Sequence, residues 1–297
     1  MSVGVLCFTT DEVVRLGSEM RHLLTAMLCA VALSAACLPF GTVAAEPAVS
    51  GYNWTGFYVG GNVGYGLSNI NNDFAFAQPL FLGGNATLNG SDANRINGAI
   101  GGGQFGYNWQ IKNYLLGIEA DLQVSGQKNS TVLNSAIVNF AGITPGSNPT
   151  AITYSDKLGL LSTLRGRFGF ISGPWLMYGT GGLAIGRLNS NGVIAPGAPP
   201  GVPGVTNLPG AWDQSTTKIG WTIGLGVESA ITSNWSWKVE YLYLNFGSVS
   251  GSATLPATNC YAGPGGCFNA SAPGNANISS KFSDNIVRVG LNYKLGN

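Results

Sequence analysis

The stretch YLLGIEADLQVS, residues 114–125, alternates apolar side chains with polar or small ones along its whole length. Leu116, Ile118 and Leu122 fall at even positions, whereas Asp121 falls at an odd one. Successive side chains of a β-strand point to opposite faces, so this period of two predicts a strand with one apolar and one polar face. The segment therefore separates two environments of different polarity.

The same alternation recurs along most of the chain and predicts an all-β protein with eight strands. The expected strands cover residues 55–68, 96–110, 114–125, 157–170, 175–188, 218–229, 235–246 and 286–295. In the fifth of these the pattern leaves the phase open, although Met177, Leu183 and Ile185 share one face.

Charged residues mark one face of the expected strands. In residues 157–170, for example, we expect Leu158 and Leu160 on the apolar face and Lys157 on the polar one. The charged residues of the polar faces are Glu119, Asp121, Lys157, Arg165, Arg167, Lys218, Glu228, Lys238, Glu240, Arg288 and Lys294, and the apolar faces carry none except Arg187, in the strand of open phase. Alternation alone fits two architectures, because such charges would be wet in a soluble sandwich and enclosed in a membrane barrel.

The lengths of the connections distinguish these two architectures. Short turns are expected near residues 111–113, 171–174 and 231–234, and long polar segments cover residues 69–95, 126–156, 189–217 and 247–285. The strict alternation of short and long places all short connections at one end, as in outer-membrane barrels. Loops of this length are uncommon in compact soluble domains.

Strand length and aromatic placement favour the same architecture. The expected strands have ~10–14 residues, against a mode of about 5–6 in globular sheets, and about 9–11 tilted residues cross a bilayer. Trp109, Tyr114 and Trp175 lie near the short turns, whereas Tyr65 and Trp221 lie nearer the long segments. Two such levels are expected at two membrane interfaces. We therefore predict an eight-stranded antiparallel up-and-down transmembrane β-barrel with short periplasmic turns and four long extracellular loops.

Composition excludes several classes of function. The 297 residues include 45 Gly and only 9% charged residues, and the formal net charge of +1 gives no electrostatic footprint for nucleic acid. The chain has one His, at residue 22, so no Ser-His-Asp or Cys-His machinery can be assembled beyond residue 45. We expect no catalytic residues, no cofactor and no metal site.

The N-terminal region carries the pattern of a secretory signal. Arg21 precedes a mostly apolar run that ends before small residues at 43–45. A transmembrane helix would need about 20 apolar residues, more than this run provides, and a lipid anchor at Cys37 would have Ser34 where such a site normally has Leu. The expected division is an N-terminal extension or mis-set start at 1–19, a signal peptide at 20–45 and the barrel domain at 46–297.

Several motifs resemble those of a known family. In chain order they are WTGFYVGGNVGYG, GLLSTLRGRFGF, PWLMYGTGGLAIG, WSWKVEYLYLNFG and VRVGLNYKL, and together they span about residues 52–295. They are similar to the small Gram-negative outer-membrane β-barrel proteins of the porin and opacity-like surface-antigen family. The resemblance implies an outer-membrane location, a periplasmic N-terminus, contact with outer-membrane lipid and lipopolysaccharide, and insertion by the barrel-assembly machinery.

The resemblance also implies a C-terminal assembly signal. Gly290, Tyr293 and Leu295 match it, with Leu where the family usually has Phe. Gly296 and Asn297 follow, which departs from the family pattern.

A barrel of eight strands has an interior just wide enough for side chains to fill. Glycines on the polar faces relieve this crowding. Isolated buried charges are very costly, so we expect pairing inside the barrel. The expected partners are Glu119, Asp121, Glu228 and Glu240 on one side and Arg165, Arg167, Lys238 and Arg288 on the other.

Three further motifs carry specific expectations. The GxGxxG spacing at 101–106 lies within an expected strand and does not open a helix, so it predicts no dinucleotide site. Cys260 and Cys267 are close enough in sequence to predict a loop disulfide in an oxidising compartment. The Pro/Gly-rich tract at 194–210 is typical of an exposed loop.

These observations predict a non-enzymatic outer-membrane scaffold and surface-exposed antigen or adhesion platform, with a host or surface ligand at its loops. The alternative is a narrow porin for small solutes, because short residues such as Gly and Thr leave room inside. A lipid-modifying barrel enzyme is a third class, and the missing His argues against it.

Overall fold

The computed structural model describes residues 52–79, 85–136, 149–195, 206–207, 210–255, 259–263, 266–269 and 274–296. The described residues all belong to one compact unit, Val49–Asn297. The expected signal peptide and N-terminal extension lie outside the described residues. Among the described residues, no helix is long and apolar enough to cross a membrane.

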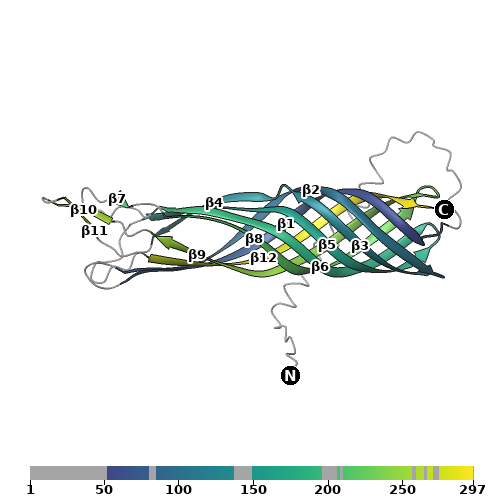
Figure 1. Cartoon of the computed structure of the whole chain (residues 1–297), viewed down its shortest axis with the longest axis horizontal. Coiled ribbons are helices and arrows are strands. Elements are labelled where there is room, and N and C mark those ends of the chain that lie inside the picture. Colours follow the sequence, from purple (N-terminus) through teal and green to yellow (C-terminus); the bar gives the residue numbers. More distant parts are fainter. Residues whose placement is uncertain are drawn as a thin grey trace, which may run out of the picture. The chain divides into compact units, whose positions relative to one another are not determined.

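Antiparallel strands make up almost all of the described unit. They are β1 (Gly56–Pro79), β2 (Asn85–Ile111), β3 (Tyr114–Ser125), β4 (Lys128–Ala136), β5 (Pro149–Ser172), β6 (Trp175–Ala195), β7 (Thr206–Asn207), β8 (Gly210–Ala230), β9 (Trp235–Leu255), β10 (Asn259–Gly263), β11 (Gly266–Asn269) and β12 (Gly274–Leu295). All of them except β7, β10 and β11 form one sheet, in which β1 pairs with both β2 and β12. The first and last strands therefore close the sheet into a barrel of tilted strands (Figure 1).

The barrel has eight strand positions, although nine strands form it. β3 and β4 follow one another along the same position, each pairing with β5, and only Gly126 and Gln127 separate them. The eight-stranded antiparallel barrel predicted from the sequence is confirmed.

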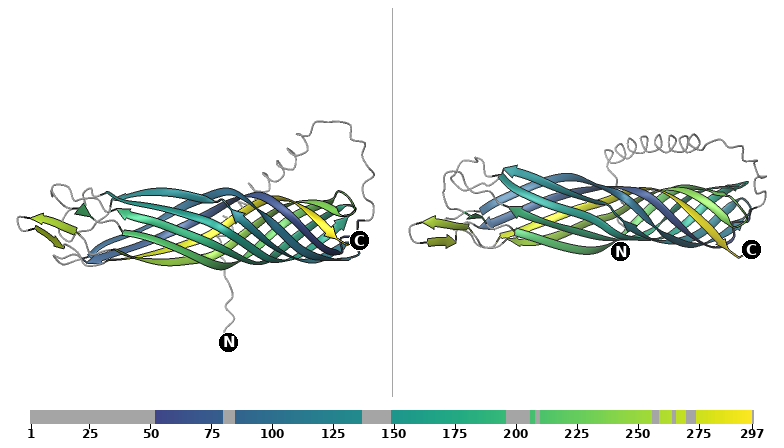
Figure 2. Two further views of the ribbon diagram at one scale, coloured as in Figure 1. Left: turned by 45° about the horizontal axis from the view of Figure 1, so that its top comes forward. Right: turned by 90° about the horizontal axis from the view of Figure 1, so that it is seen from above.

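The strands continue well past the alternating apolar pattern. β1 has 24 residues and β2 has 27, and the two remain paired as far as Pro79 and Asn85. Much of the four segments expected as loops is therefore strand, because backbone pairing does not require apolar side chains. Figure 2 shows these continuations at the end of the barrel far from the C-terminus, here called the extended end. The tight connections β2–β3, β5–β6 and β8–β9 lie at the opposite, short-turn end.

An apolar band surrounds the half of the barrel nearest the short turns. Leu122, Leu164 and Ile223 are 55%, 57% and 57% exposed, and they face outward while their sequence neighbours face inward. Among the described residues the band consists mainly of the outward side chains at 57–67, 105–111, 114–124, 160–170, 175–185, 219–227, 235–243 and 287–295. A soluble sandwich would bury these side chains, whereas hydrocarbon accommodates them on the outside of a barrel.

Aromatic pairs lie at the two edges of the band. Phe57 packs on Tyr107 with ring centroids 4.5 Å apart near the short turns. Trp221 and Tyr243, 5.5 Å apart, lie towards the extended end. Rings at both edges are typical of the two membrane–water interfaces of outer-membrane barrels.

Two irregularities change the phase of a strand. In β5 the register shifts between Leu158 and Leu161, so both leucines point inward and Lys157 points outward. The predicted phase at the start of this strand, with Lys157 on the polar inner face, is therefore wrong. In β9 the register shifts opposite Phe282 and Ser283, next to Gly247, whose φ of 66° lies in the left-handed region that favours glycine.

The depth of an outward residue should decide what a charge costs there. We expect Ile118→Arg, in the middle of the band on β3, to lower the free energy of unfolding by about 2–4 kcal/mol. Val132→Arg is the matched control, because Val132 also faces outward but lies on β4, beyond the band. Urea unfolding in lipid vesicles measures both, and equal losses would contradict the assignment of the band.

Candidate functional site

The barrel interior holds a cluster of charged side chains at the level of the apolar band, here called the charge network. Its members are Glu119 and Asp121 on β3, Arg165 and Arg167 on β5, Glu228 on β8, Lys238 and Glu240 on β9, and Arg288 on β12, and all are buried. Four carboxylates thus face four cations. These are the partners that the sequence predicted.

Glu119 is the centre of the network. Lys238 Nζ donates to both carboxylate oxygens of Glu119, at 2.9 and 3.0 Å. Arg165 Nη2 donates to Glu119 Oε1, and the Tyr58 hydroxyl donates to Oε2 at 2.7 Å. Donors from β1, β5 and β9 therefore meet at one carboxylate on β3.

Three further arginine contacts extend the network around the barrel. Arg165 reaches Asp121 at 2.9 Å and Glu240 at 3.1 Å, and Arg288 Nε donates to Glu240 at 2.7 Å. Each guanidinium thus bridges carboxylates on different strands. Such geometry is what makes a buried arginine tolerable.

Arg167 and Glu228 form the part of the network nearest the short turns. Arg167 Nη2 donates to Glu228 at 2.6 Å. The other Glu228 oxygen accepts from Ser236 at 2.6 Å and from Asn292 at 2.7 Å. Glu228 is therefore satisfied by polar side chains as well as by charge.

Two tyrosines lie inside the barrel opposite glycines. Tyr58 pairs with Gly106 and Tyr178 with Gly226, and a Cβ on either glycine would lie 2.4 Å from the facing ring. Both hydroxyls bond to network carboxylates, and Arg167 stacks on the Tyr178 ring at 4.0 Å. These tyrosines were missed in the sequence analysis, although each stands at an inward position among glycines.

Three lysines expected in the network lie elsewhere. Lys157 is exposed on the outer face because of the β5 bulge. Lys218 and Lys294 do have the inward phase, but they lie near the two ends of the apolar band, where Nζ donates to the backbone oxygens of Ser248 and Asn53 respectively. Their placement in the network is corrected accordingly.

The network lies between two apolar layers inside the barrel. The layer towards the short turns contains Tyr52, Trp54, Leu115, Ile171, Leu176 and Tyr178. The outer apolar layer, further along the strands towards the extended end, contains Ile70, Ile96, Ile100, Leu158, Leu161, Ala184, Leu242, Leu244, Phe246, Phe282 and Ile286. The alternation of polar and apolar residues predicted a polar interior. The run YLYLNF at 241–246, which is apolar or aromatic on both faces, was the available signal of this layer.

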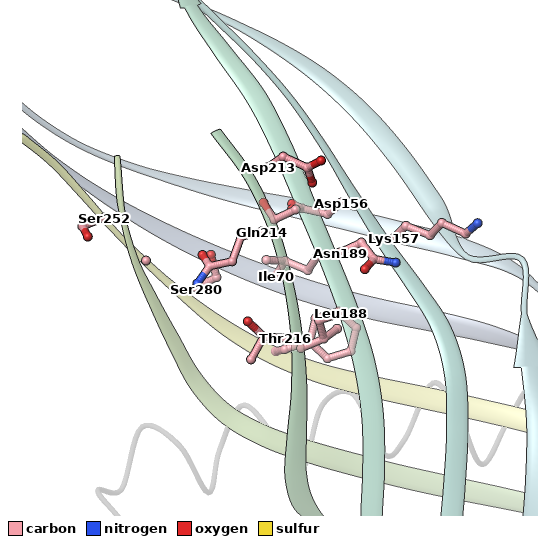
Figure 3. Close-up of a pocket in the computed structure, with 13 residues that line it drawn as sticks. Ile70, Asp156, Lys157, Leu188, Asn189, Asp213, Gln214, Thr216, Ser252 and Ser280 are labelled. Atoms are coloured by element: carbon pink, nitrogen blue, oxygen red, sulfur yellow. The ribbon is translucent and has the colours of Figure 1, made fainter. Parts of the chain in front are cut away.

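A cavity of about 250 Å³ lies beyond the outer apolar layer, towards the extended end (Figure 3). Ile70 and Phe282 of that layer line it, together with Asp156, Ser190 and Gln214. Burial raises the pKa of the Asp156 carboxyl. The cavity ends on the apolar side chains of Ile70 and Phe282, and no member of the charge network lines it. It therefore does not reach the network.

The arrangement of acidic groups offers little to a catalyst. Glu119 and Asp121 are both held by arginines inside the barrel, and within the described residues no group of three or more His, Cys, Asp or Glu side chains could hold a metal. The GxGxxG segment at 101–106 lies within β2.

The two cysteines belong to a small sheet of β7, β10 and β11. Cys260 on β10 pairs with Asn269, and Cys267 on β11 pairs with Ala262. The two lie two positions apart on one hairpin ladder, and the disulfide stays a prediction.

The expected C-terminal signal is part of the closing strand. Gly290, Tyr293 and Leu295 pair with Asn62, Val59 and Phe57 of β1. Tyr293 and Leu295 face outward in the apolar band. Their role in assembly stays a prediction.

Comparison with known proteins fits this geometry. The family model described as the outer membrane protein beta-barrel domain matches residues 33–294. The chain belongs to this family. As an outer-membrane β-barrel protein, it is located in the outer membrane, as predicted.

Relatives of this outer-membrane barrel include proteins named as outer-membrane immunogenic proteins. It is 33% identical to the 31 kDa outer-membrane immunogenic protein of Brucella melitensis, over 83% of this chain and 85% of the relative. It is 31% identical to a 22 kDa outer membrane protein of Rhizobium leguminosarum, over 58% of this chain and 65% of the relative. Among solved structures, OprG from Pseudomonas aeruginosa aligns with a TM-score of 0.40 and 12% identity, over 82% of this chain and 98% of that one.

Removing one charge from the network should cost more than removing a pair. We expect Glu119→Gln to lower the free energy of unfolding by about 3–5 kcal/mol, because it leaves buried cations without their partner. The double variant Glu119→Gln/Lys238→Met restores charge balance and should recover part of that loss. Lys294→Met, outside the network, is the control. Equilibrium unfolding in detergent measures all three, and strictly additive losses in the double variant would contradict the coupling.

Proposed function

We propose that this protein is a non-enzymatic, non-conducting scaffold of the outer membrane that displays its extended end as a surface antigen and adhesion platform. The observation that supports it is the filled interior. Two apolar layers enclose a charge network in which cations and carboxylates are equal in number. A path for solutes would need both layers and the network to move.

The length of the strands supports a display function. β1 continues from Ser68 to Pro79 beyond the apolar band, and at about 3.3 Å per residue this is roughly 40 Å of strand before tilt. Such an extension carries the ends of the strands away from the membrane surface. The immunogenic outer-membrane relatives agree with exposure of this end.

The proposed orientation places the short turns in the periplasm and the extended end outside the cell. Its partners would be outer-membrane lipid and lipopolysaccharide around the band, the barrel-assembly machinery at Gly290, Tyr293 and Leu295, and a host or surface ligand at the extended end. No nucleic-acid partner is proposed, because the formal net charge is +1.

The second candidate function is a narrow porin. The cavity of about 250 Å³ beyond the outer apolar layer is the observation that favours it, because it supplies part of a path. Leu244, Phe246 and Phe282 are fully or almost fully buried just below it and would have to leave the barrel axis.

Conductance separates the two candidates. In planar lipid bilayers we expect the folded wild-type protein to give no steady openings, because buried apolar side chains exclude ions. Heat-modifiable mobility of the same preparation in detergent gels is the control for a closed barrel. Steady openings from that preparation would overturn the scaffold and favour the porin.

Surface display can be tested on intact cells. An epitope tag inserted after Pro79, where β1 ends at the extended end, should be accessible to antibody. The same tag inserted after Lys112, in the tight β2–β3 connection, should become accessible only after the outer membrane is opened. The reverse labelling would contradict the proposed orientation.

A further inference from the structure

Basic side chains gather on the outer face of the barrel directly beyond the apolar band. Arg95 on β2, Lys128 on β4, Lys157 on β5 and Arg187 on β6 are all exposed and face outward. We call these four residues the basic cluster. They come from four neighbouring positions in the sheet, so they form one patch.

The register of the sheet brings the two lysines together. Lys128 and Lys157 are direct cross-strand partners, and Lys128 also pairs with Asn97, while Lys157 pairs with Asn189. Arg95 and Arg187 lie two residues from these asparagines, on the same outward faces. The patch is thus a row of two ammonium and two amide groups with a guanidinium at each flank.

This arrangement is unfavourable in the isolated protein. Like charges directly opposite one another destabilise a β-sheet pair. The described residues of β2, β3, β4, β5 and β6 have no outward-facing acidic side chain, and the exposed Asp73 and Asp213 lie on the flanking strands β1 and β8. None of the described ion pairs includes a member of the cluster. Figure 3 shows the Lys157 ammonium turned away from Asp156, which lies inside the barrel. An external anion would offset this repulsion.

The level of the basic cluster relative to the apolar band indicates the source of the anion. On β6 the last band residue, Ile185, is followed two positions later by Arg187, and on β3 and β4 Val124 precedes Lys128 by four positions. Tyr65, at the same edge of the band, donates to Asn97 at 2.9 Å. Tyrosines mark the level of lipid headgroups, so the cluster lies at headgroup level.

We propose that the basic cluster binds the phosphate groups of a phosphorylated outer-leaflet lipid of the lipid A type. Arginine binds phosphate bidentately, and lysine binds it as a point charge, which suits two phosphates on one rigid headgroup. The acyl chains of the same lipid would cover the apolar band below. The inference rests on the proposed orientation and deepens the proposed function by assigning the lipid partner to residues.

The test uses the full-length folded protein in neutral detergent, titrated with diphosphorylated lipid A and followed by native mass spectrometry. Lys128→Gln/Lys157→Gln should weaken lipid binding by about tenfold or more, because the variant loses two charge-assisted contacts to phosphate. Without lipid the same variant should unfold at the same temperature as wild type or higher, because the cross-strand repulsion is gone. Lys112→Gln/Lys294→Gln, at the short-turn end, is the charge-matched control and should bind like wild type.

Two ligand controls complete the design. Dephosphorylated lipid A should bind wild type and the Lys128→Gln/Lys157→Gln variant equally weakly, and inorganic phosphate should not compete at concentrations comparable to the lipid. Equal lipid binding by wild type and Lys128→Gln/Lys157→Gln would overturn the proposal, as would an equal loss in the short-turn control or effective competition by free phosphate. None of these outcomes depends on conductance or on tag labelling. Failure of the lipid proposal can therefore be distinguished from failure of the proposed function.

Discussion

Ionised groups enclosed by a wall of apolar side chains must be matched in number and geometry, and the interior of this barrel is organised around that requirement. Glu119 receives contacts from Lys238 and Arg165, and Glu240 joins Arg165 to Arg288. These contacts cross the barrel between strands far apart in sequence. They connect the strands across the interior, in addition to the backbone hydrogen bonds that close the barrel.

The matched charges also limit what the barrel can do. A carboxylate held by several cations, as Glu119 is, is a poor general base and a poor mobile ligand. The apolar layers on either side keep water from the network and strengthen its interactions. Cross-strand ties and a filled interior at the level of the apolar band are thus two results of one arrangement.

The sequence predicted the architecture because lipid and interior impose opposite polarity on alternate residues. The strands around Ile118, Ile223 and Val289 face the lipid as that pattern indicates. The paired charges could be predicted because burial forces pairing. The tyrosine–glycine contacts could not, since they depend on which residues the register places opposite one another, as with Tyr178 and Gly226.

Other differences have equally local causes. The outer apolar layer was missed because Leu242 and Leu244 occupy inward positions, where apolar residues were not expected. The strand extensions were missed because pairing through polar residues leaves no hydropathy signal. Lys157 was assigned to the wrong face because a strict period of two does not allow for the one additional residue in β5.

That additional residue, between Leu158 and Leu161, indicates how the exposed hairpins of such barrels can change in length during evolution. Inserting a single residue into a strand exchanges lumen and exterior for every position between the insertion and the hairpin tip. Inserting two residues into each of the two strands of a hairpin lengthens the hairpin by one repeat of the alternation. Every side chain then stays on its original face. Hairpins of homologous barrels should therefore differ by even steps, with odd steps confined to strands where a bulge absorbs them.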